Sequence, residues 1–425
     1  MSTETVSTAS CLHRIDAAPS EAAIALTAID RQASTHTAGP LAGWNLSIKA
    51  NIDVAGWVSH AGSAAFLQRP AATHDAALVQ QLRQQGATIL AQSNMTEFAY
   101  GALGLNQHFG TPRNPRYPNE ERVPGGSSSG AAVSVALGFS DAALCTDTSG
   151  SARIPAAFCG VVGFIPTKGL LPEDGIFPLS PSFDVPGIIT PNVTRCAQLF
   201  NALHPTTQPA TSPSQPWTLL VPTELDSLNL DDDVVQQFHA ACEALEQAGA
   251  TLVKASFPAL ITAGATAAEG GMISTEAYSI HQHWLENYGE QYDPLIRQRI
   301  TAGAALPAWR YAQASQQLHE QTRAALHQLA HVDAVLTPTC PMLAPALAPL
   351  HDSERYLATN RRSFSLTEFA NRLNLPSLSL PYTPANTHSI GLLLTAKPHN
   401  EPRLLALAQW IETLLLAKEQ HHDCD

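Results

Sequence analysis

Short apolar runs alternate with longer amphipathic stretches along most of the chain, and this alternation predicts strands separated by helices. The runs typical of buried strands are 46–48, 88–90, 142–145, 218–221, 251–254, 334–336, 377–380 and 390–394. Helical spacing of apolar residues is found at 21–31, 75–85, 128–137, 231–247, 259–288, 307–330, 365–373 and 402–418. We therefore predict an α/β fold.

A connector rich in Pro, Ser and Thr, residues 205–216, interrupts this pattern near the middle of the chain. Such a segment either links two domains or crosses the surface of one. Strands of similar type occur on both sides of it, so we expect one domain spanning residues 1–425. Residues 1–40 are expected to form an N-terminal helical arm, and residues 419–425 a frayed tail.

Composition excludes several classes of protein. The chain has 23 Lys and Arg against 36 Asp and Glu, a formal net charge of −13, which disfavours binding to nucleic acid or to an anionic membrane. Hydrophobic residues reach 44% and charged residues only 14%, which excludes a disordered chain. We see neither an apolar run of about 18 residues nor a signal peptide, and expect a soluble cytoplasmic protein.

Cysteine and histidine patterns give no sign of a metal site. The 7 cysteines are scattered without a C-x-x-C pair, so we interpret them as reduced, mostly buried thiols. His281 and His283 fall in a predicted helix, where positions two apart point to different faces. We therefore expect no bound metal.

The most informative stretch runs from Gly125 to Gly169 and opens with G-G-S-S-S-G. Glycines and hydroxyls before a predicted helix place backbone N–H groups at its positively polarised end. A phosphate-binding loop would need Lys where Ala131 stands, which excludes that loop. A nucleophile elbow, G-x-S-x-G, matches 126–130 literally, but the polar, proline-broken segment 114–122 replaces the buried strand that it requires.

A third interpretation joins these Ser/Gly clusters to an upstream lysine. Serine is a weak nucleophile at neutral pH and needs a base, which a buried, neutral lysine can supply. Lys49 directly follows the apolar run 46–48, an unusual place for a lysine. The alternative is a surface lysine that extends its amine into solvent, and the spacing alone leaves both open.

Several ordered blocks of the chain resemble the amidase signature family of serine amidohydrolases. They are P-L-A-G-W-N-L-S-I-K-A-N-I-D-V-A-G at 40–56, N-M-T-E-F-A-Y-G at 94–101, the dense block 125–169, D-A-V-L-T-P-T-C-P at 333–341 and N-L-P-S-L-S-L-P at 374–381. The resemblance implies the amidase signature fold, a large mixed central β-sheet covered by helices on both faces.

The resemblance also implies a catalytic triad. Ser151 matches the nucleophile, Ser127 the bridging serine that follows a cis peptide bond, and Lys49 the base. In the implied reaction, neutral Lys49 draws a proton through Ser127 from Ser151, whose Oγ attacks the amide carbonyl, and water hydrolyses the acyl-enzyme. No metal or organic cofactor is required.

Further residues take supporting roles by the same resemblance. Backbone N–H groups of Thr148, Ser149, Gly150 and Ser151 are aimed at the developing oxyanion. Gly126, Ser128, Asp147 and Arg153 support the relay and the oxyanion loop, although Ser128 also suits a helix N-cap. The residues expected to line the substrate pocket are Ala99, Tyr100, Gly125 and Phe177, with Phe183 as a further candidate.

Three positions depart from the family pattern. Ala50 stands where the family usually has Asp, Ser149 replaces the first of two glycines before the nucleophile, and Ile165 replaces a lysine. Ser149 is expected to narrow the oxyanion turn slightly. None of the three is a triad member, so the resemblance still implies activity.

The sequence thus predicts an amidohydrolase that cleaves a small carboxamide to a carboxylate and ammonia or an amine. Its G-G-S-S-S-G and F-A-Y-G variants resemble those of enzymes for urea-derived or malonamide-type amides. The alternatives are the glutaminase subunit of a tRNA-dependent amidotransferase and a catalytically silent binding protein on the same scaffold. The family's habit implies a homodimer, and a small accessory subunit is compatible with it.

Overall fold

The structure is a computed structural model that describes residues 6–33, 35–205, 216–383 and 389–422. Within these residues eleven strands form one mixed sheet, in the order β1-β3-β2-β4-β6-β5-β10-β11-β9-β7-β8. The strands are β1 (Leu26–Ile29), β2 (Asn45–Lys49), β3 (Thr88–Ser93), β4 (Ala142–Asp147), β5 (Val162–Ile165), β6 (Val185–Thr190), β7 (Thr218–Pro222), β8 (Thr251–Ala255), β9 (Ala334–Pro338), β10 (Ser377–Tyr382) and β11 (Ile390–Thr395). The sheet confirms the predicted α/β class.

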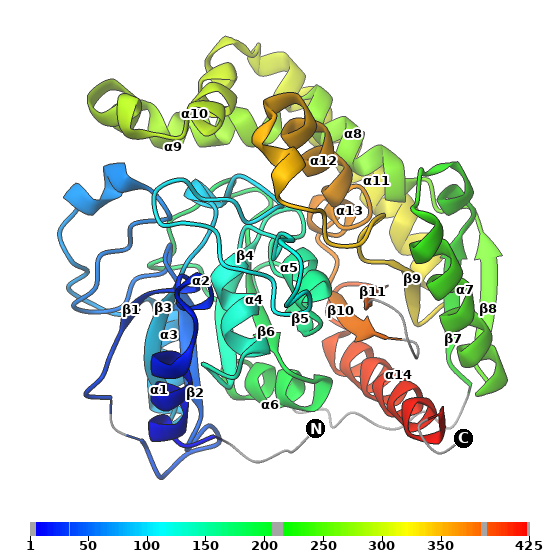
Figure 1. The fold of residues 1–425 in the computed structure, drawn as a ribbon. Coiled ribbons are helices and arrows are strands. Elements are labelled where there is room, and N and C mark those ends of the chain that lie inside the picture. Colours follow the sequence, from blue (N-terminus) through cyan, green and yellow to red (C-terminus); the bar gives the residue numbers. More distant parts are fainter. Residues whose placement is uncertain (1–5, 34, 206–215, 384–388, 423–425) are drawn as a thin grey trace.

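Fourteen α-helices in the described part of the chain surround this sheet (Figure 1). They are α1 (Thr8–Ala17), α2 (Ser20–Ala23), α3 (Ala77–Gln84), α4 (Ser129–Ala136), α5 (Arg153–Cys159), α6 (Val193–Leu203), α7 (Asp232–Gln247), α8 (Ala259–Glu269), α9 (Met272–Tyr288), α10 (Pro294–Thr301), α11 (Ala308–Leu329), α12 (Ser353–Phe364), α13 (Glu368–Arg372) and α14 (Glu401–His422).

Side chains on β4 show how the two faces of the sheet are covered. Successive strand residues point to opposite faces. Leu144 belongs to the large core beneath α3, α6 and α14, whereas Ala143 and Cys145 pack on the other face against α4 and α5. Helices therefore cover both faces, as the family resemblance implies. Small residues on α4 and α5 let those helices approach the sheet closely.

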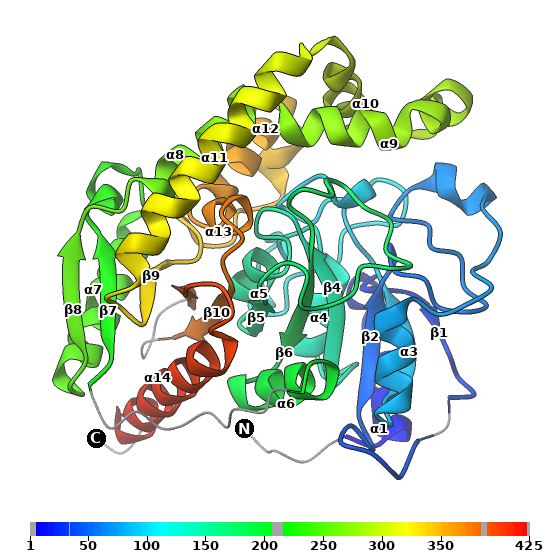
Figure 2. The same cartoon turned by 180° about the vertical axis from the view of Figure 1, so that it is seen from behind.

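Helices α8 to α13 gather at one end of the molecule, over the ends of the central strands (Figures 1 and 2). The sequence predicted one helix over 259–288, but Gly271, with φ of 59°, separates α8 from α9. A left-handed residue breaks an α-helix, and glycine adopts that conformation without steric cost. This helical layer brings α13 beside the central strands.

The N-terminal segment differs from the prediction. A helix over 21–31 was wrong, because α2 is a single turn and Leu26–Ile29 is the edge strand β1, antiparallel to β3. The short L-T-A-I run fits both a helical and a strand pattern of apolar residues, and its pairing with β3 makes it a strand. At the other end α14 continues to His422, into the segment expected to fray. The connector at 206–215 lies outside the described residues.

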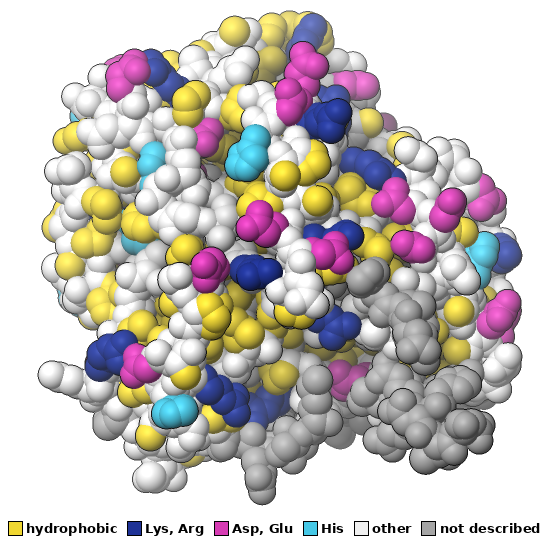
Figure 3. Space-filling model, viewed as in Figure 1, with side chains coloured by type: hydrophobic (Ala, Val, Ile, Leu, Met, Phe, Trp, Pro, Cys, Tyr) yellow, Lys and Arg dark blue, Asp and Glu magenta, His cyan; other side chains and the backbone are white. Residues whose placement is uncertain are grey.

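The surface is mixed in charge and the interior is apolar. On the face shown in Figure 3, acidic and basic side chains are interspersed with apolar ones rather than forming one field of either sign. Among the described residues, no helix has the length and apolar character needed to cross a membrane.

Candidate active site

Lys49 ends strand β2 on the face that carries α4. Leu46 and Ile48 point into the large core, so Ser47 and Lys49 point to the opposite face, where Ser47 Oγ bonds Ser134 of α4. The Lys49 side chain is fully buried, which rules out the solvent-exposed alternative. Its Nζ lies 2.7 Å from Ser127 Oγ and 2.9 Å from Thr146 Oγ1.

The ammonium charge of Lys49 is held in an unfavourable environment. Among the described residues no carboxylate lies within ion-pairing distance of its Nζ. Burial lowers the pKa of Lys49 to about 8, although the surrounding Cys145, Asp147 and Asp184 raise it in part. A lysine with this pKa has an appreciable neutral fraction at neutral pH and can accept a proton.

Ser127 lies in a tightly enclosed loop between strand β3 and helix α4. The Gly126–Ser127 peptide bond is cis. Ser127 O accepts from Thr96 N at 3.0 Å, and Gly126 N donates to Ala102 O at 2.6 Å. A Cβ on Gly126 would lie 2.6 Å from Gly104 N, so only glycine fits. The segment 96–104 therefore fixes the position of the Ser127 hydroxyl against Lys49.

Ser151 lies in the turn that leads from β4 into α5, and it is 1% exposed. Its carbonyl accepts from Ser128 N at 3.2 Å, which joins this turn to the Ser127 loop. Ser128 occupies the N-cap position of α4, but its side chain makes no cap bond and donates instead to Thr146 O at 3.2 Å. Thr146 O also receives Lys49 Nζ at 3.3 Å. Ser128 thus contributes to the shell around the lysine.

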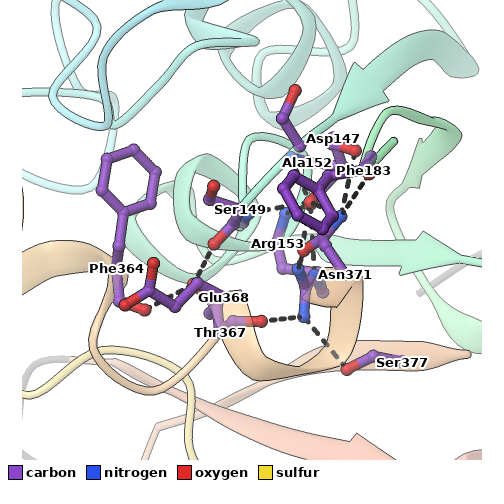
Figure 4. A network of polar contacts seen from close by, with 12 residues as sticks. Asp147, Ser149, Ala152, Arg153, Phe183, Phe364, Thr367, Glu368, Asn371 and Ser377 are labelled. Carbon is purple, nitrogen blue, oxygen red and sulfur yellow. Dashed lines mark hydrogen bonds and ion pairs between the residues drawn. The ribbon is translucent and has the colours of Figure 1, made fainter. Parts of the chain in front are cut away.

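Asp147 and Arg153 form a completely buried ion pair beside Ser151, with 3.0 Å between Oδ1 and Nη2 (Figure 4). The Asp147 carboxylate also accepts from Gly150 N at 2.7 Å and Ala152 N at 2.9 Å. Burial raises the pKa of Asp147, but Arg153, together with the hydrogen bonds from Ala152 N and Asn371 Nδ2, outweighs it and holds the pKa below its usual value. The pair therefore bonds the turn on both sides of Ser151.

Helix α13, more than 200 residues downstream, supports the same turn. Thr367 Oγ1 donates to Ser149 O at 2.5 Å, and Arg372 donates to Thr148 O and to Ser149 Oγ, each at 2.8 Å. Glu368 pairs with Arg372 at 3.1 Å. The hydroxyl of Ser149 therefore bonds Arg372 of α13.

Gly150 is the tightest point of the turn. Its φ is 137°, and a Cβ there would lie 2.3 Å from Thr367 Oγ1. Its N–H is engaged by Asp147, whereas within the described chain the N–H groups of Ser149 and Ser151 donate to no protein acceptor.

The residues expected to line the pocket differ in what they contact. Tyr100 follows the left-handed residues Phe98 and Ala99, and the Arg299 guanidinium carbon lies 3.9 Å from its ring centroid. Phe177 is half-buried and packs edge-on against Phe66 with centroids 4.9 Å apart. Phe183 lies under Arg372 and belongs to the support of the turn. Gly125 packs against α5, where a Cβ would lie 2.7 Å from Pro155 Cα.

Several residues of the site had no signal in the sequence analysis. They are Thr146, Asp184, Thr367, Asn371 and Arg372, which form hydrogen bonds with the triad candidates or with the turn. Asp184, whose pKa burial raises to about 6, accepts from Thr148 Oγ1 at 2.5 Å. Within the described residues, no cluster of His, Cys, Asp or Glu suits a metal ion.

Comparison with known proteins adds independent evidence. The family model described as Amidase matches residues 7–405. A Comamonas testosteroni protein named 2-amino-5-chloromuconic acid deaminase is 36% identical over 384 residues, which cover 89% of this chain and 82% of that protein. One subunit of the Halobacterium salinarum glutamyl-tRNA(Gln) amidotransferase is 32% identical over 88% of this chain and 96% of its own length.

Solved structures agree in fold. One described as an amidase matches with a TM-score of 0.86 at 30% identity and covers 96% of both chains. The corresponding subunit of the Thermotoga maritima glutamyl-tRNA(Gln) amidotransferase matches with a TM-score of 0.79 at 26% identity, over 94% of this chain and 89% of its own. The family model, the relatives and the shared fold together show that this chain belongs to the amidase family.

Proposed function

We propose that this protein is a serine amidohydrolase that cleaves the C–N bond of a small carboxamide, with Ser151 as nucleophile, Ser127 as bridging serine and Lys49 as base. The observation that carries the proposal is the buried Lys49 amine, without a carboxylate partner in the described residues, 2.7 Å from Ser127 Oγ. A desolvated amine favours its neutral form, which is the form that accepts a proton.

The reaction begins with proton transfer from Ser151 to Ser127 and from Ser127 to Lys49. Ser151 Oγ attacks the amide carbon to give a tetrahedral intermediate, and the proton returns through Ser127 to the leaving nitrogen as the C–N bond breaks. Water then attacks the acyl-enzyme by the same relay and releases the carboxylate. The hydroxyls cycle back to their starting state, so no cofactor is consumed.

The oxyanion hole is assigned to backbone N–H groups of the turn at residues 148–151. The N–H groups of Ser149 and Ser151 have no protein acceptor in the described residues, and Gly150 N–H is held by Asp147. Thr148 bonds Asp184 through its side-chain hydroxyl, which leaves its N–H available as well. A preorganised donor of this kind contributes about 3–4 kcal/mol to lowering a barrier. Because α13 fixes the turn from outside, these donors need not reorganise when negative charge develops.

Turnover and covalent labelling test this function together. Purified protein is given a panel of small amides, including malonamide-type and urea-derived ones, and ammonia release is measured. A fluorophosphonate is used in parallel to label the nucleophile. We expect both signals in wild type and in the matched control Ser129→Ala, and neither in Ser151→Ala. Ammonia release that survives Ser151→Ala would contradict the assignment of the nucleophile.

A second candidate is the glutaminase subunit of an amidotransferase. It is favoured by the relatives that belong to such enzymes, one of which is covered by the chain over 96% of its length. Glutamine-specific ammonia release, together with co-purification of a second subunit, would support it over the free-standing amidase. A silent binding protein predicts no labelling of Ser151. We further propose, from the family resemblance alone, a cytoplasmic homodimer.

A further inference from the structure

Asn51 follows Lys49 by two residues and bonds the same end of strand β4. It is 3% exposed. Its Nδ2 donates to Thr146 Oγ1 at 3.2 Å and to Phe177 O at 3.1 Å, and its carbonyl accepts from Phe177 N at 2.8 Å. These bonds fix the side chain between β4 and the segment that carries Phe177.

The bond to Phe177 O identifies the nitrogen side of the Asn51 amide, because a carbonyl oxygen can only accept. Asn51 Oδ1 is buried and has no hydrogen-bond partner among the described residues. A buried acceptor without a partner costs free energy. Both donor bonds are kept despite this cost, so the N–H groups are the useful part of the side chain.

Thr146 connects Asn51 to the amine of Lys49. Thr146 Oγ1 accepts from Asn51 Nδ2 and lies 2.9 Å from Lys49 Nζ, and Thr146 O lies 3.3 Å from the same Nζ. A hydroxyl oxygen has two lone pairs, and with one taken by Asn51 the other is left for the lysine. A neutral amine that donates both N–H groups to Thr146 turns its lone pair to Ser127 Oγ, 2.7 Å away. Without Asn51, the Thr146 hydroxyl would be free to rotate and donate to this lone pair in competition with Ser127.

The charge at position 51 matters as well. The titratable groups that act on Lys49 are Cys145, Asp147 and Asp184, and helix α4, which packs on the same face of the sheet, carries none. Burial raises the pKa of Cys145 to about 12 and that of Asp184 to about 6, and the pKa of Asp147 lies below its usual value. The charges of all three are therefore constant between pH 7 and 10. Because Asn51 and Lys49 bond one oxygen, a carboxylate at position 51 would lie within about 6 Å of the amine, close enough to raise its pKa by about 1 to 3.

We infer that Asn51 is a positioning residue of the proton relay. It holds the Thr146 hydroxyl as an acceptor for the Lys49 amine, so that the amine lone pair faces Ser127, and it does so without adding a charge beside the amine. This inference rests on the proposed amidase function.

The pH dependence of kcat/KM on a neutral amide tests this role. Asn51→Asp keeps the shape of the side chain and adds a carboxylate, so we expect the rising limb of the profile to move up by at least about one pH unit. At pH 7 kcat/KM should fall about tenfold or more, and it should still rise in the range where the wild-type profile is level.

The matched control is Asn192→Asp, which makes the same change at the N-cap of α6. Since β6 runs antiparallel to β4, Asn192 lies beyond the opposite end of β4 from Thr146. Asp and Asn are equally good N-cap residues. This variant should keep the wild-type profile.

Asn51→Leu removes the donors without adding a charge. We expect kcat to fall by about 2- to 10-fold, the range for one neutral hydrogen bond, with KM nearly unchanged. The rising limb of the pH profile should not move up. Thermal unfolding of each variant checks that the fold is retained.

A measurement without turnover separates this inference from the proposed function. The pKa of Lys49 is followed by ¹⁵N NMR of its Nζ in wild type, Asn51→Asp and Asn192→Asp. We expect a higher value in Asn51→Asp alone. If wild type hydrolyses no amide, the proposed function fails, and this comparison still decides whether residue 51 acts on the amine.

Three results would overturn the inference. One is the same Lys49 pKa in Asn51→Asp as in wild type, or the same rise in Asn192→Asp. Another is an unchanged kcat in a folded Asn51→Leu variant. The third is a loss in Asn51→Leu that appears only as a higher KM, which would show that Asn51 acts through the Phe177 segment and not through the relay.

Discussion

Lys49 and Arg153 are both completely buried cations beside the end of strand β4, yet their surroundings are opposite. Arg153 is neutralised by Asp147 and bonded further to Thr367 O and Asn371 Oδ1. Lys49 is surrounded by hydroxyls and a carbonyl. A buried charge that is paired holds the surrounding turn in one conformation. A buried amine without a charged partner instead has its pKa lowered towards the neutral form. In the proposed mechanism the paired charge serves the turn and the unpaired amine serves the proton relay.

The largest expected effect comes from removing the hydroxyl of the proposed nucleophile. Ser151→Ala deletes the proposed nucleophile and should lower kcat by about 10⁴-fold or more. The Asp147–Arg153 pair and the Lys49 contacts do not involve Ser151 Oγ, so the fold should be unchanged. Ammonia release and thermal unfolding measure the two effects, and a variant with more than a few per cent of wild-type activity would contradict the mechanism.

Matched substitutions of the two cations should separate their roles. Arg153→Met leaves Asp147 buried without its cation and should lower the free energy of unfolding by about 3–5 kcal/mol. Lys49→Met replaces an unpaired buried amine by an apolar chain and should change it by no more than about 1 kcal/mol, while activity is lost. Denaturant unfolding of both variants provides the measurement. Equal destabilisation would show that Lys49 is structural as well.

The pH dependence should report the unpaired amine. As the proposed base, Lys49 would accept a proton only when neutral, and with a pKa of about 8 roughly one-tenth of it is neutral at pH 7. We therefore expect kcat/KM to rise about tenfold per pH unit below 8 and to level off above it. A neutral amide substrate is required for this profile. Activity that falls as pH rises from 6 to 8 would exclude this role of Lys49.

The smallest expected effect concerns the contact between α13 and the turn. Ser149→Gly removes the bond from Arg372 Nη2, which keeps its pair with Glu368. We expect kcat to fall by about 2- to 10-fold, less than the roughly tenfold or more for loss of a hydrogen bond to a charged group, because the bond supports the turn and not the reacting atoms; KM should be nearly unchanged. Ser149→Ala should behave in the same way. A large rise in KM alone would instead place Ser149 in contact with the substrate.

Local patterns predicted the fold class and eight of the eleven strands in the described residues. The missed strands had particular causes. Pro186 and Gly187 interrupt β6 and Gly163 interrupts β5, and both residue types indicate turns. Helix α5 was missed because its small and apolar residues are buried all round and give no amphipathic period.

The candidate site likewise contains residues that the sequence predicted and residues that it did not. Lys49, Ser127 and Ser151 were found because the family resemblance marks them, and their blocks lie close to Gly-rich motifs. Arg372 was not found, because its contact with Ser149 joins residues 223 positions apart and depends on how α13 packs. Long-range polar contacts of this kind need coordinates.

The pKa of the Lys49 amine itself is the most direct measurement. It can be followed by ¹⁵N NMR of lysine-labelled protein, with Lys49→Met to assign the Nζ signal. A value of about 8, well below that of the other lysines, agrees with a desolvated amine that serves as the base. A value near 10.5, the ordinary one for lysine, would contradict the mechanism whatever the activity of the protein.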